Sequence, residues 1–482
     1  MRGGRPNGIA GDRAEPAPGA PIVDVRGSAA VLDLGELAAG GASAPLTVGY
    51  MRIWFTPVHG AVVDRAPVEP HALPRPRPAP IRLLPPQRQE GPGVAEALRE
   101  VGERLSDSHV VHVTGPRATV GGLFCALARE RTPPTEAVVY LDVRGAVLAD
   151  ILQVLFELMC AGPSGSVASA DELRAGLRGV RGLVLLRDAD FTVTEADIFG
   201  DTLRGCSIVI AGERGPSPDG VPGVTATALS DEEMTPDVVE LRVASLDASA
   251  FHALEMLIAA GGDAVHERVI AALLNGDEPA QRLRVLAELA LAEANGPWHR
   301  AASSALQPIP MGLRPERWAG ALATALAAWA HEARVQEATW THGFGTWRRT
   351  HAWLLRDGQA DRLAAARRLQ EDVALAGRWG AWRSLLLDAV DHAETRGDTA
   401  GRAWALHQLG SRALCLGDRL AARACLAEAR DLRWRTGDRA GAAVTQHNLD
   451  LASAGITAQA SRRSRLAAWA SRAGRRRPEP IG

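Results

Sequence analysis

The strongest constraint on the fold of this chain is an alternation of apolar runs and amphipathic stretches between residues 94 and 211. Runs rich in β-branched residues are typical of buried strands, and the stretches between them carry apolar residues at helical spacing. Strands that are apolar throughout and alternate with helices form a parallel sheet covered on both faces. We therefore expect an α/β domain over residues 94–246, with strands at 110–113, 137–143, 183–186 and 207–211 and helices at 95–105, 120–130, 148–159 and 170–178.

A second pattern is a repeat in the C-terminal part of the chain. Gly397-Asp398 recurs as Gly437-Asp438, and the small residue Gly410 stands where a tetratricopeptide repeat needs close approach of two helices. Repeats of this kind form antiparallel helix pairs that stack into a solenoid. We expect such repeats over residues 340–455.

The region before the repeats, residues 247–339, has helical periodicity, and we expect no strands after Asp247. It is interpreted as a helical or winged-helix-like region. The fold class predicted is thus an α/β parallel-sheet, P-loop-like domain followed by an all-α region that ends in a tetratricopeptide-type helical solenoid.

The ends of the chain have other compositions. Glycine, proline and arginine without periodicity predict disorder over residues 1–20, and a basic tail without periodicity predicts it again over 456–482. Residues 67–93 are proline-rich, which favours a stiff linker. Between these segments lies a small unit of unknown type, residues 21–66, in which we expect strands at 22–25, 46–55 and 61–63.

Charge and composition exclude several functions. The 482 residues contain 54 basic and 56 acidic side chains, and the formal net charge of −2 excludes a polyelectrolyte surface for nucleic acid. The basic run at 462–477 is the only hint of a nucleic-acid partner. Every basic residue is arginine, so no lysine can form a Schiff base or hold the phosphates of a P-loop.

The five cysteines are scattered without zinc-ligand spacing, and we expect them to be reduced thiols in a cytoplasmic protein. No apolar stretch is long enough for a membrane span, and no signal peptide is evident. We identify neither catalytic residues nor a metal site.

A degenerate phosphate-binding loop follows the first strand of the α/β domain. A working P-loop, G-x-x-x-x-G-K-[ST], needs glycines to wrap the phosphates, a lysine and a hydroxyl. When Gly115 is placed on the first glycine, Gly121 takes the lysine position and Gly122 the hydroxyl position. What remains is a helix N-terminus that can receive an anion weakly, with Arg117 and Thr119 beside it.

The third strand lacks the first of the two carboxylates that would orient Mg²⁺. Arg187 stands in its place, and Asp188 follows. A cation at this position opposes a metal ion. Asp188 remains a candidate for the nucleotide site, with pairing to Arg187 or helix capping as the structural alternative.

The order of elements from Leu83 to Ser453 resembles the STAND class of signalling P-loop NTPases, in the NB-ARC/AP-ATPase branch with C-terminal tetratricopeptide repeats. The segment from Ser207 to Arg214 is similar to the sensor strand of that family, which adds Arg214 to the candidate site. The segment Ala260–Val265 resembles the family's Gly-Gly-Leu-Pro-Leu element, with Ala264 at the proline position.

The resemblance implies a nucleotide-gated switch, in which ADP holds a closed monomer and ATP exchange allows oligomerisation. The chain departs from the family at each nucleotide contact, because the lysine, the hydroxyl and the first acid are missing. The sequence therefore predicts a non-catalytic, STAND-like signalling or regulatory scaffold, with ATP or ADP bound only at low affinity; an oligomer is compatible with it. Two alternatives stay open: a nucleotide-dependent switch that uses Arg117 as its cation, and a transcriptional regulator of that family.

Aromatic and histidine residues cluster within the repeats. They offer a face for a protein partner, and the alternative is that they fill gaps between alanine-rich helices. The candidate partner-binding residues are Trp379, Trp382, Trp404, His407 and His447.

Overall fold

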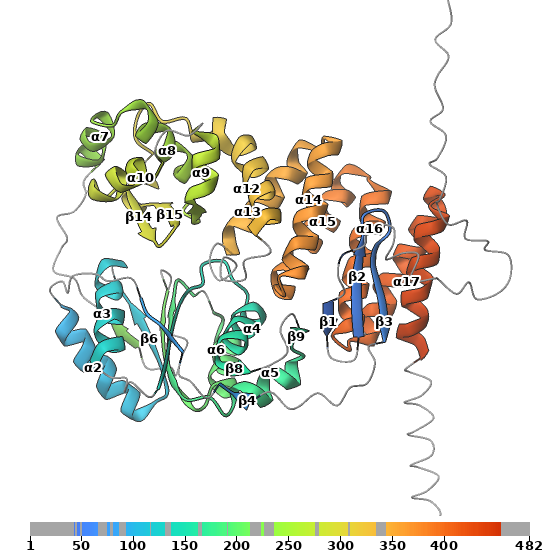
Figure 1. Cartoon of the computed structure of the whole chain (residues 1–482), viewed down its shortest axis with the longest axis horizontal. Coiled ribbons are helices and arrows are strands. Elements are labelled where there is room, and N and C mark those ends of the chain that lie inside the picture. Colours follow the sequence, from blue (N-terminus) through green and yellow to red (C-terminus); the bar gives the residue numbers. More distant parts are fainter. Residues whose placement is uncertain are drawn as a thin grey trace, which may run out of the picture.

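The computed structural model describes residues 43, 46–48, 51–65, 75–77, 81–85, 93–115, 117–130, 136–161, 166–189, 191–212, 223–225, 236–274, 279–306, 309–333 and 344–454. The expectations for residues 1–20, 22–25 and 456–482 lie outside this set. Within it, no helix is both long and apolar enough to cross a membrane. Figure 1 shows the helical region and the repeats in an arc beside the α/β domain.

The α/β domain is built on a six-stranded sheet in which every pair of neighbours is parallel. The strand order is β12-β6-β11-β10-β7-β5. The predicted elements are confirmed as α2 (Val94–Asp107), β6 (Val110–Thr114), α3 (Arg117–Glu130), β7 (Ala137–Asp142), α4 (Leu148–Met159), α5 (Ala170–Leu177), β10 (Gly182–Arg187) and β11 (Cys206–Ala211). The sequence pattern did not indicate α6 (Val193–Thr202) or the short strands β5 (Arg82–Leu83) and β12 (Gly223–Thr225).

Successive residues of the central strands point to opposite faces of this sheet. On β10, Val184 and Leu186 pack against α4, α5 and α6, whereas Leu183 and Leu185 pack against α2 and α3. The sheet is therefore buried on both sides, as its continuous apolar runs predict.

The helical region contains α7 (Pro236–Ala244), α8 (Ala248–Ala259), α9 (Glu267–Leu273), α10 (Pro279–Glu288), α11 (Ser303–Leu306), the 3-10 helix η1 (Pro315–Trp318) and α12 (Ala319–Ala333). It also contains an antiparallel sheet of β13 (Val265–His266), β15 (Trp298–Ala301) and β14 (Ala292–Asn295). The expectation that strands end before Asp247 is therefore wrong. Only two residues, Gly296 and Pro297, join β14 to β15, and Gly296 has φ 57°. A glycine in the left-handed region at the first loop position is a hairpin signal.

The repeats consist of α13 (Phe344–Asp357), α14 (Ala360–Leu375), α15 (Trp379–Arg396), α16 (Thr399–Cys415), α17 (Arg419–Thr436) and a helix over 439–454. Three of these helices begin at an aspartate whose carboxylate accepts a backbone N–H, at Asp398, Asp418 and Asp438. The residue before each is a glycine with φ between 67° and 82°, which ends the preceding helix. The predicted fold class is confirmed, with a small sheet inside its helical region.

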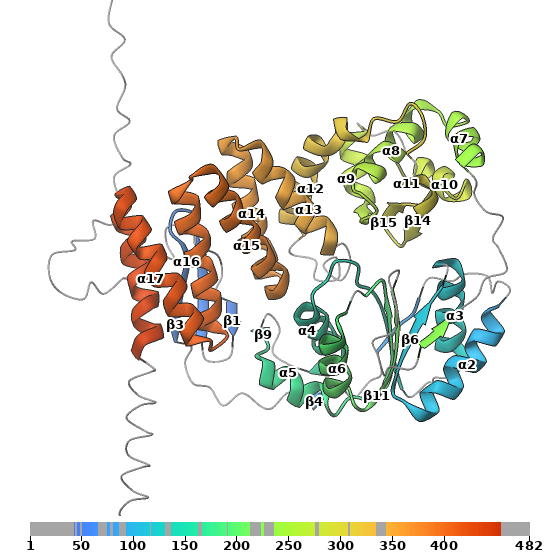
Figure 2. The same cartoon turned by 180° about the vertical axis from the view of Figure 1, so that it is seen from behind.

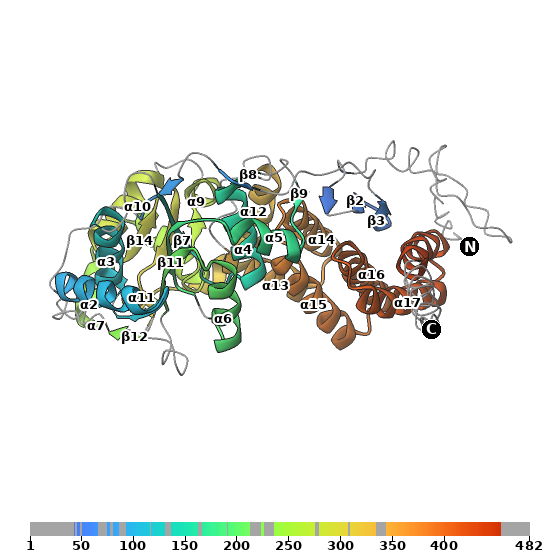
Figure 3. The ribbon, with the colours of Figure 1, turned by 90° about the horizontal axis from the view of Figure 1, so that it is seen from below.

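The N-terminal unit is a sheet with strand order β3-β2-β1-β9. The apolar run at 46–55 was expected as one strand, but it forms β1 (Leu46–Val48) and β2 (Met51–Thr56), which pair antiparallel. β3 (Gly60–Arg65) follows, and β9 (Ser166–Val167) comes from the α/β domain. From the proline-rich segment, β4 (Arg75–Pro76) pairs with β8 (Cys160–Ala161). Figures 1 and 3 both show β2 and β3 beside α16, which is far away in the sequence.

Candidate functional site

The carboxyl ends of the parallel strands meet at one edge of the sheet, which is where ligands bind in open α/β folds. β6 leads into α3 there, β7 ends at Asp142, β10 at Arg187 and β11 at Ala211. The register places Arg187 between Asp142 and Ala211. The polar side chains at this edge therefore come from neighbouring strands.

Most of the residues predicted for a nucleotide site lie along this edge, but at two separate places. Gly115 is exposed between β6 and α3, whereas Thr119, Gly121 and Gly122 are buried in the first turns of α3. Asp188 follows β10, and β11 lies between β10 and β6. Two strand spacings amount to about 10 Å, so Asp188 belongs to a different local cluster.

Two predicted residues are described only in part or not at all. The backbone of Arg117 starts α3, but its side chain is outside the described part of the structure, as is the whole of Arg214.

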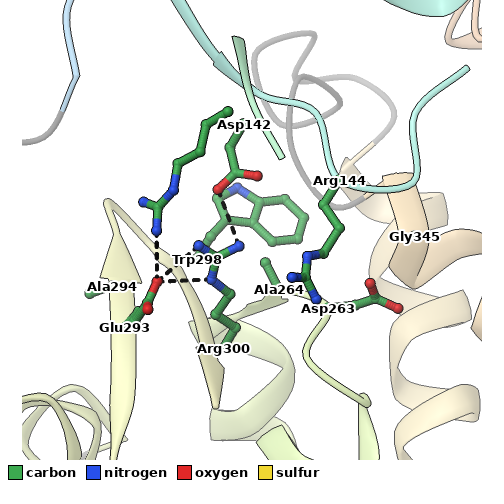
Figure 4. Close-up of a pocket in the computed structure, with 10 residues that line it drawn as sticks. Asp142, Arg144, Asp263, Ala264, Glu293, Ala294, Trp298, Arg300 and Gly345 are labelled. Atoms are coloured by element: carbon green, nitrogen blue, oxygen red, sulfur yellow. Dashed lines mark hydrogen bonds and ion pairs between the residues drawn. The ribbon is translucent and has the colours of Figure 1, made fainter. Parts of the chain in front are cut away.

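Asp188 lies in a buried cluster of ion pairs that joins the α/β domain to the helical region. Figure 4 shows its partners Arg144 and Arg300. Its Oδ2 accepts a hydrogen bond from Nη1 of Arg300 at 2.9 Å, and Nε of Arg144 is 3.6 Å away. Arg300 is on β15, and its Nη1 also lies 3.4 Å from Oδ2 of Asp142. Asp188 itself has φ 58°, a strained value for a residue with a Cβ.

Glu293 on β14 completes this cluster. One of its oxygens, Oε2, accepts hydrogen bonds from Arg300 at 2.8 and 3.1 Å and from Nη2 of Arg187 at 3.1 Å. Arg187 and Arg300 are each 5% exposed, so both guanidinium groups are desolvated where they meet the carboxylate. A charge buried in this way is stable only when it is paired.

A second pair of charges flanks the cluster on the side of the repeats. Nε of Arg349, on α13, donates to Oδ2 of Asp263 at 2.9 Å. Nη1 of Arg144 donates to the carbonyl oxygen of Gly262 at 3.4 Å. The segment that resembles the family's Gly-Gly-Leu-Pro-Leu element thus lies at this edge, with Ala264 in the lining of the cavity (Figure 4).

The electrostatics of the cluster follow from burial and from charge pairing. Burial acts to lower the pKa of Arg300, but Asp142, Glu293 and Asp188 outweigh it and raise that pKa. Tyr140 lies on β7, two residues before Asp142. Burial raises the pKa of its phenol to about 12. Burial also raises the pKa of Asp263, against the opposing effect of Arg349.

The space left between these side chains is small. It amounts to about 30 Å³, enough for one or two water molecules. Asp188 and Arg187 were singled out from the sequence, Asp188 as a candidate for a nucleotide site, whereas Glu293 and Arg300 were not. In the structure Asp188 pairs with Arg300 and Arg144. The sequence did contain a signal for the two residues that were not singled out: Glu293 and Arg300 are opposite charges on the two short runs that flank the turn at Gly296-Pro297.

The residues predicted to bind a partner lie around the N-terminal sheet. The imidazole of His407 is fully buried, and its Nε2 lies 2.7 Å from the carbonyl oxygen of Ala61. Nε2 of His447 lies 3.0 Å from that of Val63. The edge of Phe55 meets the face of Trp382, with ring centroids 5.6 Å apart.

The other two predicted residues do not contact the sheet in the same way. Trp379 is buried beside Trp382, and its indole N–H donates to the carbonyl oxygen of Ala374. Trp404 is half-buried under the guanidinium of Arg367, 4.8 Å from its ring centroid.

A further contact joins α4 of the α/β domain to the start of α15. The carboxylate of Asp150 accepts the backbone N–H groups of Gly380 and Ala381 at 2.7 and 2.6 Å. Glu157 accepts two hydrogen bonds from Arg378, each 2.9 Å long. The α/β domain is thus bonded to the repeats through α4 and to the helical region along the edge where its strands end (Figure 2).

Among the described residues, no group of three or more His, Cys, Asp or Glu side chains is arranged to hold a metal ion. All five cysteines are free thiols, and four of them are buried.

No protein-family model matches this chain, and no curated protein matches it. Among solved structures it is similar to the crystal structure of a Signal Transduction ATPase with Numerous Domains (STAND) protein with a tetratricopeptide repeat sensor from Pyrococcus horikoshii. The match has 11% sequence identity and a TM-score of 0.40, and it covers 80% of this chain and 69% of that one. A likeness this loose supports no conclusion about function.

Proposed function

We propose that this chain is a non-catalytic, STAND-like signalling scaffold that binds a protein partner through its helical repeats. The observation that carries the proposal is the cluster around Arg300. At the edge of the sheet where a nucleotide would lie, the strand ends are joined to the helical region by the protein's own charges.

Charge pairing at this edge argues against tight phosphate binding. The guanidinium groups of Arg187 and Arg300 are held by Glu293, and Arg300 also by Asp188. A phosphate that bound to either guanidinium would have to displace these carboxylates and leave them buried without their partners, which typically costs several kcal/mol. Because the lysine and hydroxyl positions of the loop are glycines, neither of the two side-chain contacts of a working P-loop is available there in compensation.

The repeats supply the output surface in this proposal. They already hold a segment more than 340 residues away in the sequence, through contacts made by His407 and Gln408. Free thiols agree with a reducing compartment, and we place the scaffold in the cytoplasm.

The test is thermal unfolding of the full chain with ATP or ADP and Mg²⁺. A ligand at 100 times its Kd adds ~2.7 kcal/mol to the free energy of unfolding. We expect the melting temperature to stay unchanged up to millimolar nucleotide. Co-purification of stoichiometric ADP, or hydrolysis of ATP above the buffer rate, would overturn the proposal in favour of a nucleotide-dependent switch.

A further inference from the structure

The contact between the N-terminal sheet and the repeats is made by main-chain atoms of β3. The N–H of Ala61 donates to Oε1 of Gln408 at 3.2 Å, and its carbonyl oxygen accepts from Nδ2 of Asn448 at 2.9 Å and from His407. The N–H of Val63 donates to Oδ1 of Asn448 at 3.1 Å. The carbonyl oxygen of Val63 lies 3.0 Å from Nε2 of His447. We call the four helix residues that make these bonds the strand-reading row: His407, Gln408, His447 and Asn448.

These hydrogen bonds reproduce the pattern that a neighbouring strand would provide. Residues two apart on a strand present their N–H and C=O groups to the same edge. Ala61 and Val63 are two apart, and the strand-reading row satisfies both polar groups of each. β3 is the last strand of its sheet, so the row covers an edge that would otherwise be open.

Three of the four residues of the row are buried, His447 is half-buried, and hydrogen bonds hold the row in position. His407 and Asn448 are fully buried, and Gln408 is 4% exposed. Nε2 of His407 is the donor to Ala61, because a carbonyl oxygen can only accept. The hydroxyl of Thr445 lies 3.1 Å from Nδ1 of the same ring. A second hydrogen bond fixes the amide of Asn448, since its Nδ2 also donates to Oγ of Ser411 at 2.8 Å.

The row also limits which side chains the strand can carry. A Cβ added at Gly60 would lie 2.7 Å from Nε2 of Gln408, closer than real Cβ atoms approach, and 3.3 Å from Cδ2 of His407, which is a tight contact. Gly60 also has φ 84°, which disfavours any other residue. Glycine followed by small apolar residues therefore fits, whereas a bulky residue at the first position does not.

The same sheet is bonded to the α/β domain at its opposite edge. β1 pairs in parallel with β9, where Thr47 is opposite Ser166. The N-terminal sheet thus lies between the α/β domain and the repeats, and Figure 3 shows it alongside both α14 and α16. Release of β3 would remove one of the connections between these two parts of the chain.

We propose that the strand-reading row is a receptor for the edge of an extended β-strand, that β3 is its occupant within the chain, and that a protein partner binds by presenting a strand of the same kind. This inference rests on the proposed function, because it names how the repeats bind their partner. The partner strand begins with glycine and continues with small apolar residues. The row recognises it through its main-chain N–H and C=O groups.

The test uses the full chain and a labelled synthetic peptide of residues 51–65, which contains β2 and β3. In the wild-type chain the row is occupied, so we expect weak binding of the peptide. We expect Gly60→Ala to displace the chain's own β3 from the row and therefore to tighten peptide binding by about tenfold or more. The matched control is Gly417→Ala, because Gly417 has φ 82° and its added Cβ meets nothing within 4 Å. The control should bind the peptide as the wild type does.

Main-chain recognition is tested with N-methylated peptides on the Gly60→Ala chain. Methylation at Ala61 or Val63 removes an N–H that the row accepts, and it should weaken binding at least about fivefold. Methylation at Arg65 is the control, because its N–H bonds only to its own neighbour Asp64. Equal binding of all three methylated peptides, or equal binding to both glycine variants, would overturn the inference.

A second measurement covers the case in which Gly60→Ala fails to fold. A protease site is inserted between Arg65 and Arg75, and the cleaved chain is mixed with excess labelled peptide. Exchange of the N-terminal piece for the peptide supports the inference, and absence of exchange contradicts it. Nucleotide binding in the thermal test would defeat the proposed function and leave these peptide results unaffected, so the two failures are distinguishable.

Discussion

Among single residues, Arg300 has the largest number of charged partners at the edge of the parallel sheet. It lies within 3.4 Å of three carboxylates, from Asp142, Asp188 and Glu293. These come from two different parts of the fold, since Glu293 is on β14 and the other two follow β7 and β10. Its planar fork of five donors can bond to several carboxylates at once, which a lysine ammonium could not match in geometry.

Arg300→Met should therefore destabilise the chain by about 3–5 kcal/mol, because it leaves buried carboxylates without their cation. The measurement is denaturant unfolding at neutral pH. Arg204→Met is the control, since Arg204 pairs with Asp201 on the surface, where both side chains are more than 60% exposed. That control should unfold at the wild-type midpoint; a similar loss in both variants would contradict the role given to Arg300.

Asp150 makes the stability depend on pH. Burial raises its pKa to about 6, against the opposing effects of the amides of Gly380 and Ala381 and of two arginines. The unfolded chain holds this proton only below about pH 4, so the folded chain binds more protons between pH 4 and 6. Asp150 therefore favours the folded state at low pH and loses this contribution as the pH rises through 6.

We expect the free energy of unfolding of the wild type, relative to Asp150→Asn, to decrease between about pH 4 and 6 and then to level off. Urea unfolding of both proteins at several pH values measures this. Parallel pH profiles would show that the carboxyl group does not titrate in this range.

At the scale of secondary-structure elements, α16 and α17 illustrate how small residues determine the packing of the repeats. A Cβ at Gly410 on α16 would lie 2.6 Å from Cγ of Leu426 and 3.1 Å from the carbonyl oxygen of Ala422, both on α17. Gly410 is the small residue at which the sequence predicted the close approach of two helices of a tetratricopeptide-type pair. The structure supplies the reason for the glycine, which is the close approach of the two helices.

Gly410→Ala should destabilise the chain by about 1–3 kcal/mol through overpacking, although alanine is the better helix former by about 1 kcal/mol. Gly320→Ala is the matched control, because its Cβ would meet only the flexible end of Arg362, at 3.4 Å. Thermal unfolding should show a loss for the first and no loss for the second. A gain in both variants would mean that the helix pair can separate at no cost.

At the scale of the whole molecule, the α/β domain is connected to the rest of the chain at separate places. The Arg300 cluster connects it to the helical region, and the contact of Asp150 with α15 connects it to the repeats. The N-terminal sheet adds a third connection through β9. The chain as described is therefore in a closed arrangement, in which each large part contacts the α/β domain.

Gly380→Leu should open the contact between α4 and α15, because even a Cβ at this position would collide with Val147. We expect a larger radius of gyration by small-angle X-ray scattering and faster hydrogen exchange of the amides of residues 380 and 381. Amides in α16 and α17 serve as the internal control and should exchange at the wild-type rate. An unchanged scattering curve would contradict this account of the closed arrangement.

Local sequence patterns were sufficient for most of the longer elements, although not for α6 or for the hairpin of β14 and β15. α4 was predicted at the bounds that the structure gives, and the left-handed glycines at 397, 417 and 437 follow the predicted repeat. Such elements are encoded by residues a few positions apart, through apolar periodicity and capping. The absence of lysine from the loop after β6 was equally visible, because it is a property of residue identity alone.

Only the tertiary structure determined where β3 lies and what surrounds Arg300. β3 is bonded to side chains nearly 350 positions later, and Arg300 to a carboxylate 112 positions earlier. Neither pairing leaves a periodic signal in the sequence. A buried polar group needs a partner, but the residues next to it in the chain do not specify which one. The packing of whole elements determines the partner. It brings distant polar groups together and excludes the water that would otherwise form hydrogen bonds with them.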